Sequence, residues 1–169
     1  MTAAAVARNE YAALDRCVYL NQASLGLVPR RSTEAMVDFV VDVAQHGNLR
    51  LSDVAEERIL DDLRQAAAGL LDAPPRSVAV VGGASEALGQ LAILTAQADG
   101  EVLLVASDFP SVTYPWLVAR ERFGTVLRWV DDTPEQDLTA VLVDGIRGGT
   151  AAVCFSAVQF ATGSLVDVG

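Results

Sequence analysis

The sequence contains no lysine, because all 12 residues counted as lysine or arginine are arginines. Acidic residues number 22, and the net charge is −10. Nucleic acids and anionic membrane surfaces are bound through clustered basic side chains, so this charge balance argues against both as partners. Histidine occurs once, at His46, which excludes a metal site built from several histidines.

Long apolar runs are also missing from the sequence. None approaches the roughly 20 residues that a membrane-spanning helix needs. The N-terminal segment lacks the continuous apolar core that is typical of a signal peptide. We therefore expect a cytoplasmic protein that does not bind a membrane.

Cysteine and aromatic residues are scarce. The two cysteines, Cys17 and Cys154, do not have the spacing of a metal site or a redox pair. Cys154 lies in the apolar run 151–155, which predicts a buried, unreactive thiol. Hydrophobic residues nevertheless make up 51% of the 169 residues, and this composition excludes a disordered chain and predicts a folded core.

Two kinds of pattern divide the chain into residues 1–76 and residues 77–169. The first part has apolar residues at helical spacing and an intervening loop at 18–28. The second part alternates short apolar runs with helical stretches, which predicts an α/β fold with a mostly parallel sheet flanked by helices. Helices are expected over 3–14, 29–45 and 52–73, and strands over 77–81, 101–106, 125–130 and 151–155.

A glycine-rich turn, GGASE at residues 82–86, follows the first expected strand. Two glycines allow a tight turn, and the next residues place free N–H groups and the Ser85 hydroxyl at a helix N-terminus. This arrangement suits an anion or a phosphate group, although a plain strand-to-helix turn with a serine cap gives the same pattern. The sequence is neither a P-loop nor the G-x-G-x-x-G dinucleotide turn.

Two further loops directly follow expected strands, at residues 107–111 and 156–163. In doubly wound sheets, the loops beyond the carboxyl ends of the strands converge on the ligand. Phe109 in the first loop either stacks on a planar ring or packs in the core. Gln159 in the second loop is a hydrogen-bonding side chain in otherwise apolar surroundings.

Together with YLNQAS at residues 19–24, these loops resemble the class V aminotransferase family of fold-type I pyridoxal-phosphate (PLP) enzymes. That family includes cysteine desulfurases, isopenicillin-N-epimerase-like proteins and kynureninases. The matching segments occur in family order and cover nearly all of the chain. They are YLNQAS at 19–24, GN at 47–48, GASEA at 83–87, DFPS at 108–111 with YPW at 114–116, and AVQFATG at 157–163.

The resemblance implies a role for each of several residues. Gly83, Ala84 and Ser85 would bind the cofactor phosphate. Phe109 would stack on the pyridine ring, and Gln159 or its neighbour Phe160 would approach the ring oxygen. Asn21 and Ser24 would face a small amino-acid substrate, with no metal involved.

The chain departs from the family at Phe109, where many members, desulfurases among them, have a histidine. A phenylalanine can stack but cannot transfer a proton. Together with the VQFATG pattern, it resembles the kynureninase or epimerase side of the family more than the desulfurases. The reaction stays open among transamination, epimerisation and side-chain cleavage.

The larger departure is that the Schiff-base lysine and the aspartate that pairs with the pyridine nitrogen are missing. The resemblance therefore implies the N-terminal half of the large PLP-binding domain, completed by a second polypeptide that carries the C-terminal half. By the same resemblance, strands 77–81 and 151–155 would each pair with strands of that second half. A mean hydropathy of +0.32 fits a largely covered surface, and we expect a hetero-oligomer. The alternatives are a non-catalytic binding or regulatory module and an inactive truncation.

Overall fold

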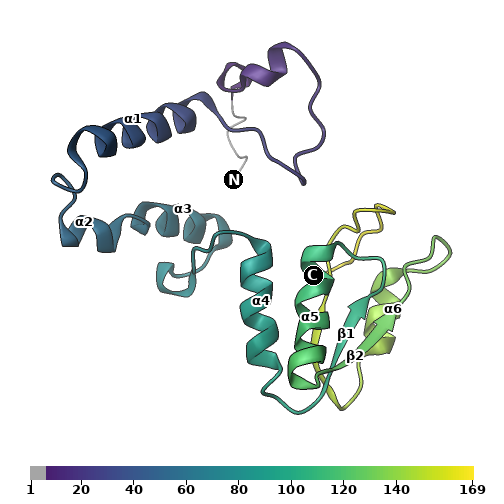
Figure 1. The fold of residues 1–169 in the computed structure, drawn as a ribbon. Coiled ribbons are helices and arrows are strands. Elements are labelled where there is room, and N and C mark those ends of the chain that lie inside the picture. Colours follow the sequence, from purple (N-terminus) through teal and green to yellow (C-terminus); the bar gives the residue numbers. More distant parts are fainter. Residues whose placement is uncertain (1–6) are drawn as a thin grey trace. The chain divides into compact units, whose positions relative to one another are not determined.

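The computed structural model describes residues 7–169, which form two units. One unit extends to Val78, and the other covers Ala79–Gly169. Figure 1 shows the helices of the first unit and the small sheet with its helices in the second. We describe each unit by itself.

The N-terminal unit consists of helices that follow local signals. Helix α1, Arg30–His46, begins after Pro29 and ends at Gly47, whose φ is 58°. Helix α2, Asp53–Arg58, is capped by the Ser52 hydroxyl, which accepts a 3.2 Å hydrogen bond from the Ala55 amide. Two acids open helix α3, Asp61–Leu71, and Asp72 in the left-handed conformation ends it.

Two expected helices differ in the structure. The helix expected over 52–73 is broken between α2 and α3, because Leu60 has φ −102° and ψ 3°, and the acids at the start of α3 suit a new helix N-terminus. The helix expected over 3–14 lies partly outside the described residues. Its described part forms two short 3₁₀ turns, Arg8–Glu10 and Ala12–Asp15, in place of an α-helix.

The C-terminal unit contains a three-stranded parallel sheet in the order β2-β1-β3. Strand β1 is Glu101–Val105, β2 is Val126–Val130 and β3 is Thr150–Cys154. The helices of this unit are α4 (Ala84–Thr95), α5 (Pro110–Phe123) and α6 (Leu138–Gly145). The expectation of an α/β fold with a parallel sheet flanked by helices is confirmed.

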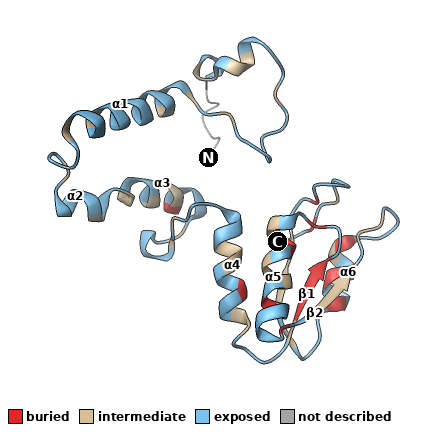
Figure 2. Cartoon of the chain, in the orientation of Figure 1, coloured by how far each residue is buried: buried red, intermediate tan, exposed pale blue. Residues whose placement is uncertain are grey.

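The central strand β1 carries the core, because alternate side chains of a strand point to opposite faces. Val102 and Leu104 pack with residues of α4 and α5 on one face. Leu103 and Val105 pack with residues of α6 on the other face. All four side chains are fully buried, and Figure 2 shows the buried residues concentrated on β1 and the helices beside it.

The strand expected over 77–81 does not form. Pro75–Ser77 is a 3₁₀ turn, and among the described residues no backbone hydrogen bond joins residues 79–81 to a strand. A strand exists only where a neighbour accepts and donates its backbone hydrogen bonds, so an apolar sequence alone does not make one. Val81 remains exposed.

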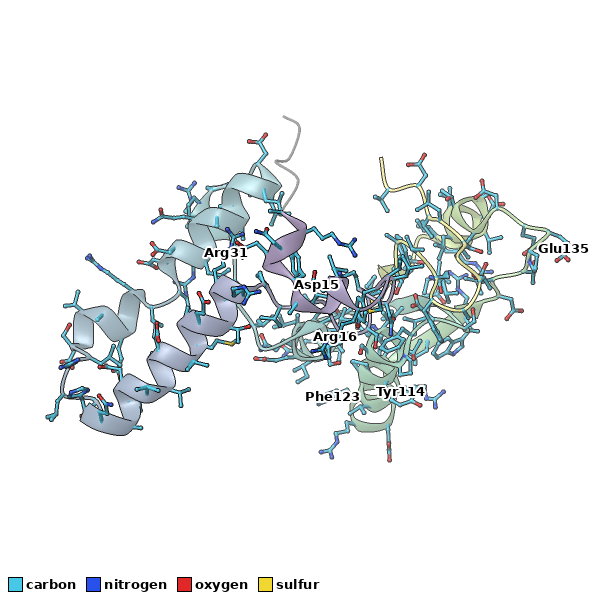
Figure 3. All side chains as sticks on the ribbon, turned by 90° about the horizontal axis from the view of Figure 1, so that it is seen from above. Asp15, Arg16, Arg31, Tyr114, Phe123 and Glu135 are labelled. Carbon is cyan, nitrogen blue, oxygen red and sulfur yellow. The ribbon has the colours of Figure 1, made fainter. Side chains whose placement is uncertain are left out.

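Large apolar side chains are exposed along both units. On α1, Val37, Val40 and Val41 lie at helical spacing and are all exposed, although the sequence suggests a buried face. Tyr114 and Phe123 project from α5 (Figure 3). No helix in residues 7–169 combines the length and the apolar character that crossing a membrane requires.

Candidate functional site

Three loops of the C-terminal unit meet at the carboxyl end of the sheet. One loop leads into α4, one joins β1 to α5, and one follows β3. Ser85 of α4 donates a 2.9 Å hydrogen bond to the hydroxyl of Ser111 on α5. Asp108, directly before α5, binds residues of the loop after β3. The structure thus brings together five of the seven site residues expected from the sequence.

The N-terminus of α4 is open. Gly83 is the N-cap and receives no side-chain cap, and a Cβ added to it would have nothing within 4 Å. In the described part of the chain, no group accepts a hydrogen bond from the amides of Ala84 and Ser85. Free amides at the positive end of a helix dipole favour an anion.

Ser111 adds a second hydroxyl to this edge; it belongs to the DFPS motif, which assigned no role to it. It follows Pro110, the first residue of α5, so the N-termini of α4 and α5 approach each other at the Ser85–Ser111 contact. The local signal was Pro110, which predicts the start of a helix but cannot predict which other helix lies beside it.

Phe109 is the N-cap of α5 and is 47% exposed. Its ring meets the ring of Phe160 edge to face, with centroids 5.3 Å apart and an interplanar angle of 84°. Aromatic pairs prefer this geometry. Phe109 is therefore not a core residue, and half of its surface is available to another group.

Asp108 is buried, with 6% of its surface exposed, and its carboxylate joins two loops. One oxygen accepts hydrogen bonds from the Phe109 amide and the Ser156 hydroxyl, each 2.6 Å long. The other accepts from the Ser156 amide at 2.7 Å and from Gln159 Nε2 at 3.1 Å. None of the ion pairs among the described residues includes Asp108, so hydrogen bonds alone compensate its burial.

Gln159 is buried as well, with 2% of its surface exposed. Its Nε2 also donates a 3.1 Å hydrogen bond to the Ser156 carbonyl, while its Oε1 is buried without a partner among the described residues. The backbone around it forms a tight loop, in which the backbone N–H of Gln159 donates a hydrogen bond to the Ser164 carbonyl and Gly163 has a φ of 77°. Only glycine adopts that conformation without strain.

A second aspartate holds the other end of this loop. Asp132, in the segment after β2, accepts hydrogen bonds from the hydroxyls of Thr162 and Ser164. The loop after β3 is therefore attached at both ends, to Asp108 after β1 and to Asp132 after β2. Asp108 belongs to the DFPS motif, but the motif assigned no role to it, and Asp132 lies in no motif, because the partners of both aspartates are far away in the sequence.

Asn21 and Ser24 belong to the N-terminal unit, whereas the five other expected residues belong to the C-terminal unit. They belong to an exposed loop in which the Tyr19 hydroxyl donates to the Leu25 carbonyl at 2.6 Å and the Leu27 amide donates to Gln22 Oε1 at 3.0 Å. These bonds give the loop a defined shape. That Asn21 and Ser24 face the substrate stays a prediction.

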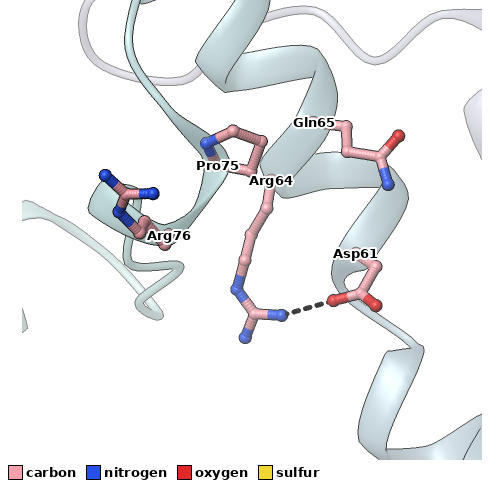
Figure 4. Close-up of a pocket in the computed structure, with 5 residues that line it drawn as sticks. All are labelled: Asp61, Arg64, Gln65, Pro75 and Arg76. Atoms are coloured by element: carbon pink, nitrogen blue, oxygen red, sulfur yellow. Dashed lines mark hydrogen bonds and ion pairs between the residues drawn. The ribbon is translucent and has the colours of Figure 1, made fainter.

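A hollow of about 580 Å³ in the N-terminal unit is open to solvent (Figure 4). Its lining includes Arg64, which pairs with Asp61 at 2.9 Å, and Arg76. None of the residues that line this hollow belongs to the three loops at the carboxyl end of the sheet. Residues 7–169 also contain no cluster of acidic, cysteine or histidine side chains suited to a metal ion.

Two groups near the sheet have shifted pKa values. The hydrogen bond from Arg128 lowers the pKa of Glu101, at the end of β1 opposite the three loops. Burial raises the pKa of the Cys154 thiol. Cys154 is free and only partly buried, although the sequence predicted a buried thiol, whereas Cys17 is exposed; the low reactivity of Cys154 stays a prediction.

Comparison with known proteins identifies the family to which this chain belongs. Residues 18–169 match the model of the family described as Aminotransferase class-V. A protein of Aeropyrum pernix described as a probable cysteine desulfurase is 31% identical over 173 residues, which cover 95% of this chain and 41% of that protein. The names of the relatives give no support to the expected kynureninase or epimerase side of the family.

Solved structures share the fold. A lysine-to-alanine mutant of C-DES, with glycine covalently linked to its PLP cofactor, matches with a TM-score of 0.80 and 21% identity, over 95% of this chain and 43% of that one. The apo cysteine desulfurase of Thermococcus onnurineus NA1 matches with a TM-score of 0.73 and 18% identity, over 95% and 42%. The chain therefore spans about two fifths of the length of these relatives. With residues 18–169 matched to the family model, the chain belongs to the class V aminotransferase family.

Proposed function

We propose that this chain is one part of a PLP-dependent enzyme that acts on an amino acid, and that a second polypeptide supplies the reactive lysine. The observation that carries the proposal is the meeting of the open α4 N-terminus, the exposed Phe109 ring and the loop after β3 at the carboxyl end of one sheet. Ligands of open α/β sheets bind at this edge. The family match gives the ligand its identity, because the C-DES relative carries PLP.

The α4 N-terminus fits the phosphate of this cofactor. The amides of Ala84 and Ser85 are without partners in the described chain, and Gly83 leaves open space in front of them. The hydroxyls of Ser85 and Ser111 lie beside these amides and can turn from each other to the phosphate oxygens. Amide and hydroxyl donors at a helix N-terminus are a common phosphate site.

The exposed face of Phe109 fits the pyridine ring. Its backbone amide is fixed by Asp108 and its ring edge by Phe160, so the side chain offers a preorganised aromatic surface. PLP, when bound, supplies an electron sink for bonds at the amino-acid Cα. Phe109 cannot take up or release a proton, so proton transfer at this face belongs to another group.

In this proposal the lysine and its proton chemistry come from outside these 169 residues, none of which is a lysine. Asn21 and Ser24 face the substrate in this proposal. The desulfurase and cystine C-S lyase names of the relatives favour a sulfur-containing amino acid, with cleavage at the side chain. The same lack of lysine favours the second candidate, a non-catalytic binding module.

Unsatisfied surfaces support a second polypeptide. In the described chain, β2 and β3 each pair only with β1, and residues 79–81 have no strand partner. An apolar groove of about 250 Å³ lies between α4 and α5. Unpaired strand edges and apolar grooves of this kind are usually covered in a stable protein.

Native mass spectrometry of the untagged protein from its own source tests the proposal. The expected result is a complex of this chain with a second, different polypeptide and bound PLP. A homo-oligomer without the cofactor would contradict the catalytic proposal and support a binding module or an inactive fragment. A reading frame next to this one that encodes the missing lysine and aspartate would identify the partner independently.

A further inference from the structure

We infer that Gln159 is a positioning residue, which acts through Asp108 to hold Phe109, and that it does not contact the cofactor ring. This inference rests on the proposed function, because it concerns the residue that faces the ring. It replaces the role that the family resemblance implies for Gln159. Three observations carry it.

The first observation is which hydrogen-bonding atoms of the Gln159 side-chain amide are already used. Its Nε2 is within 3.1 Å of two acceptors, Asp108 Oδ2 and the Ser156 carbonyl, which use both of its hydrogens. The remaining atom, Oε1, can only accept a hydrogen bond. The ring oxygen of PLP is a phenolate acceptor and needs a donor, which Gln159 cannot supply in this arrangement.

The second observation is burial. Gln159 has 2% of its surface exposed, and its Oε1 has no access to solvent. Phe109 and Phe160, by contrast, are 47% and 61% exposed. A ligand at this edge of the sheet would therefore contact the rings of Phe109 and Phe160, and not the buried side-chain amide of Gln159.

The third observation is the route from Gln159 to Phe109. Gln159 gives Asp108 one of its four hydrogen bonds, and the same carboxylate accepts from the Phe109 amide at 2.6 Å. Loss of the Gln159 donor leaves a buried carboxylate oxygen undersatisfied and thereby weakens the hold of Asp108 on the Phe109 amide.

A double-mutant cycle on PLP affinity tests the inference. Equilibrium dialysis of PLP against the untagged protein, with any partner it retains, compares wild type, Gln159→Met, Asp108→Asn and the double variant. Gln159→Met should weaken PLP binding about three- to tenfold, which corresponds to one charge-assisted hydrogen bond. The double variant should bind PLP no more weakly than Asp108→Asn alone, because Gln159 affects Phe109 only through Asp108. Additive effects of the two substitutions would overturn the inference.

Ser164→Ala is the matched control, because it removes a hydrogen bond from the same loop to Asp132 and leaves Asp108 untouched. It should leave PLP affinity within about twofold of wild type. A loss equal to that of Gln159→Met would mean that general loosening of the loop is responsible, and would overturn the inference. Ser156→Ala removes another donor to Asp108 and should act like Gln159→Met.

Hydrogen exchange separates this inference from the proposed function. The amides of Phe109 and Ser156 donate to Asp108, and both should lose protection in Gln159→Met whether or not PLP is present. If the wild-type protein does not bind PLP, the proposed function fails while this measurement still decides the link through Asp108. Unchanged protection of both amides would overturn the inference.

Discussion

Single residues of the site differ in how well the sequence predicted them. Phe109 follows strand β1 after a short loop, and that position alone places it at the carboxyl edge of a parallel sheet, whereas the apolar run before Gly83 forms no strand in the described chain. Asp108 occupies the same kind of position, yet its partners Ser156 and Gln159 are 48 and 51 residues away. Sequence spacing carries no signal for a contact at that separation, so the buried carboxylate emerges only from the fold.

Phe109→Ala should weaken PLP retention in the assembled protein roughly fivefold, because an aromatic contact contributes about 1 kcal/mol. Assembly itself should not change, since the side chain is half exposed. Bound PLP per protein, measured after dialysis, gives the comparison. Phe109→Tyr keeps the ring and should retain the cofactor. Unchanged occupancy in the alanine variant would exclude the stacking role.

The two thiols should react at very different rates. Cys17 is exposed, whereas burial raises the pKa of Cys154 and lowers its thiolate fraction at any given pH. Alkylation of the folded protein at pH 8 should therefore modify Cys17 first, and Cys154 only slowly. Peptide mapping after a timed reaction identifies the modified residue. Rapid modification of Cys154 in Cys17→Ser would show that the strand β3 is less protected than the structure indicates.

At the scale of elements, the sequence predicted every end of the three strands of the sheet to within one residue. Strand β1 is apolar from Val102 to Val105 and buried on both faces there, which is the pattern that identifies a central parallel strand. Residues 77–81 have a similar composition but no neighbour in the described chain, so no strand forms. Pairing is a property of two segments, and one segment's sequence cannot supply it.

The sheet also has an electrostatic anchor at the end opposite the site. Arg128 of β2 donates to the Glu101 carboxylate of β1 at 2.8 Å and to the Gly145 carbonyl that ends α6. Thr150 of β3 lies within 3.4 Å of the same carboxylate. One carboxylate thus links all three strands, and the hydrogen bond from Arg128 lowers its pKa.

This link should make stability depend on pH. Because the folded pKa of Glu101 is lowered, its contribution to the free energy of unfolding is present above the ordinary glutamate pKa of about 4.3 and is lost as the pH falls through the folded value. Glu101→Gln should therefore lower Tm at pH 7, and the difference from wild type should shrink below pH 4. Thermal melts at both pH values measure it. Glu121→Gln, at an exposed position on α5, is the control and should show no such convergence.

At the scale of the whole molecule, the described chain leaves much apolar surface without a cover. In the N-terminal unit, Ala68 is the only buried residue among those that the structure describes with a burial state. Val37, Val40 and Val41 form an apolar face on α1 that stays exposed in the part of the chain that the structure describes. A helix gains most of its stability from packing such a face, so this unit depends on a cover.

Val40→Asp tests whether a second polypeptide supplies that cover. Val40 is 64% exposed, so the substitution costs the chain little of its own packing, but a charge would have to be buried against the partner. We expect the complex to fall apart, seen in native mass spectrometry as loss of the heavier species. Glu34→Gln changes an exposed polar position on the same helix and should leave assembly intact. A complex that survives Val40→Asp would place the interface elsewhere, leaving the groove between α4 and α5 and the open sheet edges as the surfaces that remain to be covered.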